Sequence, residues 1–325
     1  MNCGASVFGP SPPSAAVPPQ SQPTQQTQQT QQTMATPTGQ QPQRHNHTAF
    51  HSPAQPYQLP HGRSVVDTFR NPKEKLYQVM MFAFGIVGWL CALLGIWVTV
   101  MAPQALASLA LLGLYAVIAL IGYLISVAAF RATAFGNMIL LGPRQFPELH
   151  TMVVTGANEL GMRSTPTAFL YNSNGMFNAF ARRLLGGSYV FLTSALVEAN
   201  DDEQVKFVIG HELGHHAAGH LNLWLNILKL PAYLVPFLGR AYSRSRELTC
   251  DAIGSYLSKN PVASETAIQM LACGCSRMNQ RMSCDAFIDQ ERMVPPIFGF
   301  LTEIFRTHPR LTRRVAALRK LAQRP

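Results

Sequence analysis

The sequence predicts an α+β fold, a mainly helical domain with a small β-sheet, preceded by a two-helix transmembrane hairpin. Only 13% of the 325 residues are charged, against about 25% in an ordinary soluble domain. So few charged residues cannot cover a fully water-exposed surface of a protein of this size. Two long stretches in the first half of the chain are apolar and free of charge. After them, segments with helical periodicity alternate with short β-prone runs.

Residues 1–70 are predicted to form a disordered tail rich in glutamine and proline. Residues 1–62 hold 13 Gln and 11 of the 23 Pro, and Arg44 is their only charged residue. Such a segment has too few apolar side chains to build a core. We interpret it as a solvated linker, with a tether or interaction tail as the alternative.

Residues 71–135 are predicted to form the transmembrane hairpin. The runs 79–101 and 105–130 contain no charged residue, and each is longer than the roughly 20 residues that cross a bilayer core as a helix. Because only three residues connect them, both outer ends lie on the same side. Basic residues flank these ends, which places the remainder of the protein in the cytoplasm by the positive-inside rule. A buried hairpin of a soluble protein is the alternative.

Residues 140–325 are predicted to form the folded domain. Its expected strands are 167–171 and 188–193, and its expected helices are 146–162, 202–220, 242–258, 262–279 and 309–322. The apolar stretch 221–239 is interrupted by Asn226, Lys229, Pro231 and Pro236. We interpret it as a membrane-dipping or lid-like segment, and spanning remains open.

The net charge of +10 comes largely from the C-terminal end, because residues 306–325 hold seven basic residues and no acidic one. The charge therefore does not indicate a nucleic-acid-binding face, and we expect no nucleic acid partner. The basic helix is interpreted as a solvated face, or as a surface attracted to anionic lipid.

The run His211-Glu212-Leu213-Gly214-His215 lies within the helix predicted over 202–220. Histidines four residues apart project from one face of a helix, so two imidazoles can bind one zinc ion. Glu212 follows the first histidine and lies close to the open position of the metal. It is therefore a candidate general base that takes a proton from water. The pattern predicts a zinc metallopeptidase with one Zn²⁺ per chain.

Glu247, on the next predicted long helix, is the candidate third ligand, since two His and one Glu form an established catalytic set. Asp251, four residues later, can accept a hydrogen bond from the other ring nitrogen of a ligating histidine. His216 is expected to face solvent or a partner. His220 is expected to pack or to form a hydrogen bond rather than to bind the metal.

Four ordered blocks at 178–181, 208–220, 246–251 and 307–314 carry a wider similarity. Through them the chain resembles the M48-type membrane zinc metallopeptidases, which include HtpX and the CAAX prenyl protease Ste24, and it is most similar to HtpX-like members. The resemblance covers roughly 145–320. It implies a zincin-like fold, zinc ligation by His211, His215 and Glu247, and Glu212 as general base.

The resemblance also implies roles for three further residues. Asn178 would lie beside an edge strand that receives the substrate in extended form. His308 and Arg314 would line or support the cleft, and His308 is a candidate for stabilising the transition state. Asp251 would support a ligand.

These observations predict a membrane-anchored zinc endopeptidase at the cytoplasmic surface of a bacterial inner membrane. Protein or peptide substrates are expected, with misfolded membrane proteins as the implied class. A CAAX-prenyl-type protease is less favoured because that branch has more spanning segments. An intramembrane site-2-type protease would hold the motif in a spanning helix, which Glu203 and Lys206 make too polar. A non-catalytic membrane scaffold would be expected to lack a ligand or the base.

Overall fold

The computed structural model describes residues 62–103, 105–185 and 187–323. Residues 1–61 of the predicted tail therefore lie outside the described residues. The tail boundary predicted at residue 70 is too late. Val65–Phe69 form the short helix α1, in which Ser64 caps the amino terminus, and Val65, Val66 and Phe69 are buried. Three apolar side chains on one short helix give this segment enough surface to join the core.

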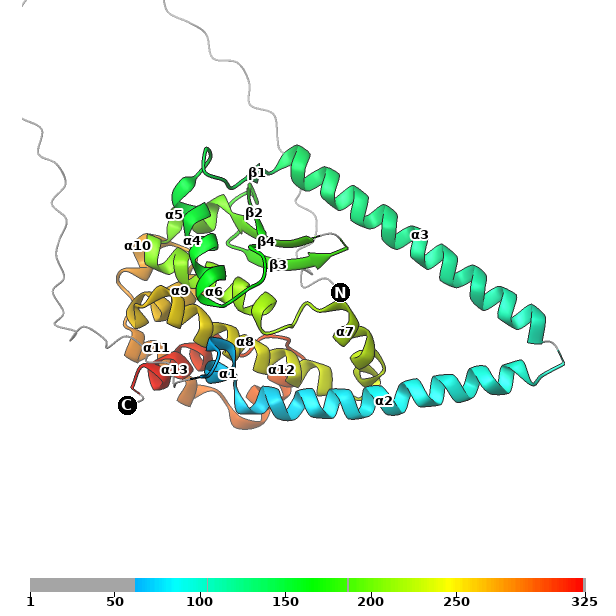
Figure 1. Cartoon of the computed structure of the whole chain (residues 1–325). Helices are drawn as coiled ribbons and strands as arrows, with labels where there is room; N and C mark the ends of the chain where they lie inside the picture. Colours follow the sequence, from blue (N-terminus) through cyan, green and yellow to red (C-terminus); the bar gives the residue numbers. More distant parts are fainter. Residues whose placement is uncertain (1–61, 104, 186, 324–325) are drawn as a thin grey trace, which may run out of the picture. The chain divides into compact units, whose positions relative to one another are not determined.

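The predicted fold class is confirmed, because helices surround one four-stranded sheet and two long apolar helices precede them (Figure 1). The strands are β1 (Ile139–Leu140), β2 (Thr167–Tyr171), β3 (Ala179–Leu184) and β4 (Gly187–Thr193). The other helices are α2 (Pro72–Val100), α3 (Ala105–Asn137), α4 (Pro147–Glu159), α5 (Ser194–Ala199), α6 (Asp202–Ala217), α7 (Leu223–Lys229), η1 (Leu230–Leu234), α8 (Leu238–Ser258), α9 (Pro261–Cys273), α10 (Ser276–Asn279), α11 (Cys284–Asp289), η2 (Gln290–Met293), α12 (Pro296–Ile304) and α13 (Leu311–Ala322).

The sheet has the order β1-β2-β4-β3, in which β2 and β4 are parallel and β3 is an antiparallel edge strand. Strand β4 is covered on both faces. Val190 and Leu192 belong to the main core, whereas Tyr189 and Phe191 pack with Phe130 near the end of α3. Burial on both faces explains why β4 is a continuous apolar run and not an alternating one.

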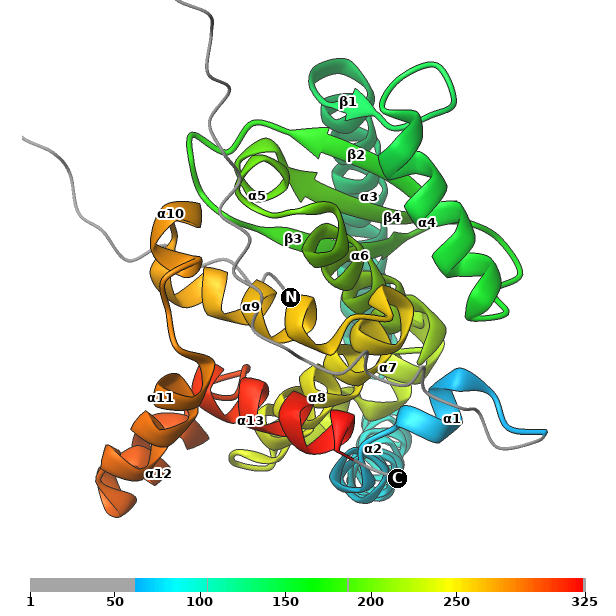
Figure 2. The same cartoon turned by 90° about the vertical axis from the view of Figure 1, so that its left-hand side faces the viewer.

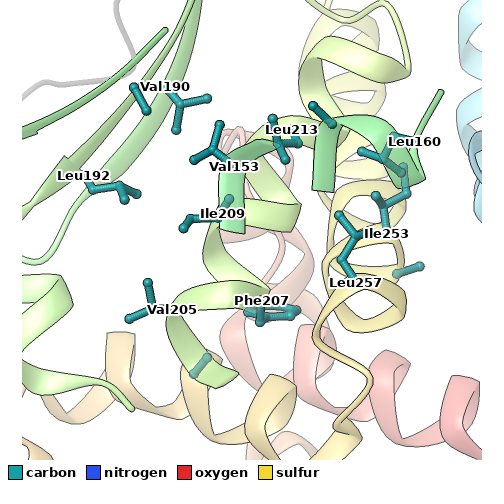
Figure 3. Close-up of a cluster of buried hydrophobic side chains, with 14 of the residues drawn as sticks. Val153, Leu160, Val190, Leu192, Val205, Phe207, Ile209, Leu213, Ile253 and Leu257 are labelled. Atoms are coloured by element: carbon teal, nitrogen blue, oxygen red, sulfur yellow. The ribbon is translucent and has the colours of Figure 1, made fainter. Parts of the chain in front are cut away.

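Helix α6 occupies the centre of the domain, where it contacts β3 and β4 as well as α4, α8 and α9 (Figure 2). Val205, Ile209 and Leu213 of this helix lie in the main apolar cluster with side chains from the sheet and from α8 (Figure 3). The helix that carries the His-Glu motif is therefore fixed by packing on several sides.

Helices α6 and α8 cross closely, and each has a glycine at the point of contact. A Cβ atom on Gly210 would lie 2.9 Å from the Cα atom of Gly254. A Cβ atom on Gly254 would lie 2.6 Å from the backbone oxygen of Phe207. Since neither backbone can move without disturbing the core, glycine is required at this crossing.

Helices α2 and α3 are long and apolar enough to span a membrane, and both continue into the domain. The first turns of α2 pack on α8, and Met81 is buried there. At the other end of the hairpin, the last turns of α3 cover the sheet through Phe130 and Ala134. The two helices are thus parts of the folded domain as well as candidate spans.

The stretch 221–239 forms α7 and η1, which pack against α2. The Trp89 Nε1–H group donates a hydrogen bond to the Ile227 carbonyl at 3.0 Å. Elements of seven and five residues are shorter than the roughly 20 residues that span a bilayer. A single spanning helix over this stretch is therefore not formed, whereas its insertion beside α2 remains a prediction.

The basic face predicted for the C-terminal helix is largely neutralised by acidic side chains. Four arginines at or near this helix form ion pairs with carboxylates of other elements. The pairs are Arg310 and Arg313 with Glu291 and Glu303, Arg314 with Asp251, and Arg319 with Glu265 and Asp285. The prediction of a solvated or lipid-attracted face is wrong for Arg314, which is buried, whereas Arg313 is half-exposed. The acidic partners lie outside the helix, so counting charges along it does not reveal them.

We expect Gly254→Ala to destabilise the protein by about 1–3 kcal/mol, the usual cost of an overpacked core. The added methyl group would contact backbone atoms of α6, which cannot rotate away as a side chain can. The midpoint of thermal unfolding in detergent measures the effect. Gly136→Ala is the matched control, because a Cβ atom there meets nothing within 4 Å. Equal midpoints for the two variants would contradict a tight crossing.

Candidate metal centre

Helix α6 has well-formed ends that fix the position of its histidines. Asp201 and Gln204 form a reciprocal capping box at the amino terminus, with hydrogen bonds of 2.8 and 3.0 Å. Gly219, with φ of 76°, follows the carboxyl end, and only glycine adopts this left-handed conformation without strain. Within the helix, His211 and His215 lie on one face with their ring centroids 5.1 Å apart.

The structure brings the three predicted ligands together. The His211 Nε2 atom lies 3.5 Å from Glu247 Oε2, and the His215 Nε2 atom lies 3.6 Å from Glu247 Oε1. Ligand atoms around a tetrahedral zinc ion are about 3.3 Å apart, since each bond is about 2.0–2.1 Å long. The donor set and its spacing therefore fit a tetrahedral divalent ion.

The charges around the cluster favour a cation. Burial opposes ionisation of Glu247, but the neighbouring His211, His215 and His308 hold the pKa of its carboxyl group well below the usual range. Burial also lowers the pKa of His211, yet Asp251 and Glu247 outweigh this effect and raise it to about 10. A positive charge at this position is therefore stabilised, and a bound metal ion would provide it in place of a proton.

Glu212 is buried beside the cluster, and its burial raises its pKa to about 7. A carboxyl group with a pKa near neutrality can both accept and return a proton. A backbone hydrogen bond from Ala181 opposes part of the shift. Since Ala181 belongs to β3, the edge strand of the sheet lies directly beside Glu212.

A buried ion pair holds the far side of His211. The His211 Nδ1 atom lies 2.9 Å from Asp251 Oδ1. Arg314 donates two hydrogen bonds to the same carboxylate, from Nε at 2.8 Å and from Nη2 at 2.6 Å. All three side chains are buried. Arg314 therefore supports the cluster through Asp251 and does not line an open cleft.

His308 and Asn178 occupy different places relative to the cluster. The His308 Nε2 atom lies 3.4 Å from Glu247 Oε2, and its side chain is 49% exposed. The contacts of Asn178 are with Thr193, whose Oγ1 accepts its backbone N–H at 3.1 Å, and with Tyr171. The structure thus brings His308 to the centre, whereas Asn178 lies immediately before β3 and makes its described contacts elsewhere.

The expectation that His216 faces solvent is wrong. Its side chain is buried, and its Nε2 atom lies 3.0 Å from the Tyr189 carbonyl oxygen. Strand β4 covers this side of α6, which helical periodicity alone does not indicate. The expectation of hydrogen bonding for His220 is confirmed, because its two ring nitrogens lie 3.1 Å from His215 Nδ1 and 3.1 Å from Glu74 Oε1.

Glu74 was missed at the sequence level. It lies in the first turn of α2 and is fully buried, 146 positions before the histidine that it contacts. The available signal was an acidic residue between Lys73 and Lys75, directly before a charge-free run. The lysines on either side of it indicate a solvated helix end, and no local pattern connects Glu74 with the centre.

Comparison with known proteins identifies a family. The model of peptidase family M48 matches residues 143–235 and 223–322. The chain is 29% identical over 172 residues to the plastoglobule-localized metallopeptidase 48, chloroplastic, of Arabidopsis thaliana, covering 48% of this chain and 49% of that protein. It is 26% identical over 185 residues to a protease HtpX homolog of Methanopyrus kandleri, covering 45% and 57%.

The chain therefore spans about half the length of these curated relatives. Among solved structures, Ste24p of S. mikatae aligns with a TM-score of 0.41 and 16% identity, over 69% of this chain and 66% of that one. The family match covers more than half of the chain and includes His211, Glu212 and Glu247. The chain belongs to peptidase family M48.

Proposed function

We propose that this protein is a membrane-anchored zinc endopeptidase in which His211, His215 and Glu247 bind one zinc ion. The observation that carries the proposal is the convergence of two imidazole nitrogens and two carboxylate oxygens at 3.5 and 3.6 Å. Zinc is the ion that a His₂Glu set holds in peptidases. When bound, zinc would supply Lewis acidity, which polarises a scissile carbonyl and makes water easier to deprotonate.

Glu212 is proposed as the general base. Its carboxylate accepts a proton from the attacking water and then donates it to the nitrogen of the leaving amine. In the metal-free protein, burial raises the pKa of Glu212 to about 7. A bound cation would lower this pKa and so favour the carboxylate that accepts the proton.

Strand β3 is proposed to bind the substrate as an added strand. In the described part of the chain it lies at the edge of the sheet and pairs with β4, and an extended peptide can pair with such an edge through backbone hydrogen bonds. The contact of Ala181 with Glu212 supports this path, since it brings the edge to the proposed base. Asn178, at the start of β3, would contact the substrate, and His308 would stabilise the transition state beside Glu247.

The proposed setting is the bacterial inner membrane, with the catalytic domain in the cytoplasm. Helices α2 and α3 are the two candidate spans among the described residues, and basic residues at their outer ends favour the cytoplasmic side. Two spans favour an HtpX-like protease over a CAAX-prenyl-type enzyme. Misfolded membrane proteins are the proposed substrates, because the centre would lie close to the lipid surface.

Asp251 and Arg314 are proposed to fix the ring of His211. The carboxylate accepts the hydrogen bond from Nδ1–H, which leaves Nε2 free for the metal. Arg314 neutralises the carboxylate through two hydrogen bonds. This arrangement orients the ligand and keeps it in the required tautomer.

We expect Glu212→Gln to lower the rate of hydrolysis of an unfolded model protein by about 10²–10⁴-fold, the usual contribution of a general base. Zinc content should stay at one ion per chain, because the three ligands are intact. Glu203→Gln is the control, an exposed acid on the same helix, and should cleave at the wild-type rate. Equal activity of Glu212→Gln and wild type would exclude Glu212 as the base.

We expect Arg314→Leu to destabilise the metal-free protein by about 3–5 kcal/mol, because it leaves the buried Asp251 without its counter-charge. Arg313→Leu, one position earlier, removes a half-exposed arginine and should cost about 0–1 kcal/mol. Thermal unfolding of both variants measures the difference. A similar loss in the two variants would contradict a special role for the pair of Arg314 with Asp251.

A further inference from the structure

The ring of His215 has a partner on the side away from Glu247, and that partner is His220. The two Nδ1 atoms lie 3.1 Å apart. On the opposite edge of the His220 ring, Nε2 lies 3.1 Å from Glu74 Oε1. A continuous chain of contacts therefore runs from the base of α2 to a proposed metal ligand.

The directions of the hydrogen bonds in this series of three side chains follow from the chemistry of the groups. If His215 binds the ion through Nε2, a neutral ring carries its proton on Nδ1, which must donate. His220 Nδ1 then accepts, so the proton of His220 lies on Nε2 and is donated to the Glu74 carboxylate. Each group has one role, and all three can be satisfied together.

The series of hydrogen bonds from His215 through His220 to Glu74 is fixed at its Glu74 end. Glu74 is fully buried, and it also accepts hydrogen bonds from Arg70 and from the Thr249 hydroxyl group of α8. Arg70 in turn donates to the Ala218 carbonyl at 3.1 Å, at the end of α6. A buried carboxylate held by three donors has little freedom to move.

The backbone around His220 supports the same geometry. Its N–H group donates to the His215 carbonyl at 3.1 Å, and its own carbonyl accepts from Asn226 Nδ2 at 3.0 Å. The left-handed conformation of Gly219 turns the chain back at the end of α6. As a result, the side chain at position 220 returns to the ring of His215.

We infer that His220 and Glu74 are positioning residues that hold the ring of His215 for metal binding, so that the first membrane helix supplies an essential support of the centre. The inference rests on the metal site proposed above. The arrangement parallels the support of His211 by Asp251, with a histidine inserted between ligand and carboxylate. Each metal-binding histidine then has a buried carboxylate behind it, one from α8 and one from α2.

The test is the zinc affinity of the full chain in detergent, measured by competition with a chromophoric chelator. His220→Leu removes the hydrogen bonds to His215 and Glu74 and should weaken affinity about 10- to 100-fold, as loss of such supports typically does. The absorption bands of the Co²⁺-loaded protein should also shift, because the ligand ring is no longer fixed. His220→Gln, which can accept one hydrogen bond and donate another, should restore part of the affinity.

His216→Leu is the matched control, since His216 is buried next to His215 and its side chain bonds, among the described residues, a backbone carbonyl. Its affinity and Co²⁺ spectrum should equal those of wild type, even if its unfolding midpoint falls. Should His220→Leu fail to fold, Glu74→Gln tests the same series of hydrogen bonds, because it keeps the shape of the side chain and removes the charge. It should weaken affinity in the same direction.

Two outcomes would overturn the inference and leave the proposed function intact. The first is one ion per wild-type chain with unchanged affinity and spectrum in His220→Leu and Glu74→Gln. The second is two ions per wild-type chain with one lost in Cys250→Ser, because Cys250 Sγ lies 3.6 Å from His220 Nδ1 and His220 would then be a ligand. A wild-type chain that binds no zinc would instead refute the proposed function.

Discussion

The close crossing of α6 and α8 at Gly210 and Gly254 sets the distance between the two imidazoles and Glu247. The histidines come from one helix and the carboxylate from the other, so their spacing depends on how near the two backbones lie. Any side chain at the crossing would separate them. The packing of α6 against the sheet on its other side prevents it from shifting to compensate.

Burial of charge is the second constraint on the centre. Glu74, Glu247 and Asp251 are each buried, and each contacts at least one histidine. A buried carboxylate without a partner would be strongly unfavourable. The pairs therefore fix ring orientation and tautomer at the same time as they satisfy the charges. For Glu212, the neighbouring groups offset only part of the cost of burying its charge, so its pKa rises to about 7.

The two candidate spans, α2 and α3, are also parts of the folded domain. The end of α3 covers one face of the sheet with aromatic contacts, as in the pair of Phe130 and Phe191 with centroids 5.4 Å apart. Arg70, just before α2, donates to the Ala218 carbonyl at the end of α6, and Glu74 of α2 accepts a hydrogen bond from Thr249 of α8. Removal of the hairpin would therefore expose apolar surface and buried charge, and would not simply release a soluble domain.

The sequence by itself determined the longer helices, the two apolar spans and the pair His211 and His215, because these depend on local periodicity and residue type. It also indicated Glu247 and Asp251, which share one helical face. It did not indicate the short helices α1, α5, α10, α11 and α12 or the strands β1 and β3. Only the tertiary structure decided that His216 is covered by β4, that Arg314 is buried behind Asp251, and that Glu74 reaches His220. Those contacts join segments far apart in the chain, and no local pattern encodes which distant charge a folded backbone will bring near.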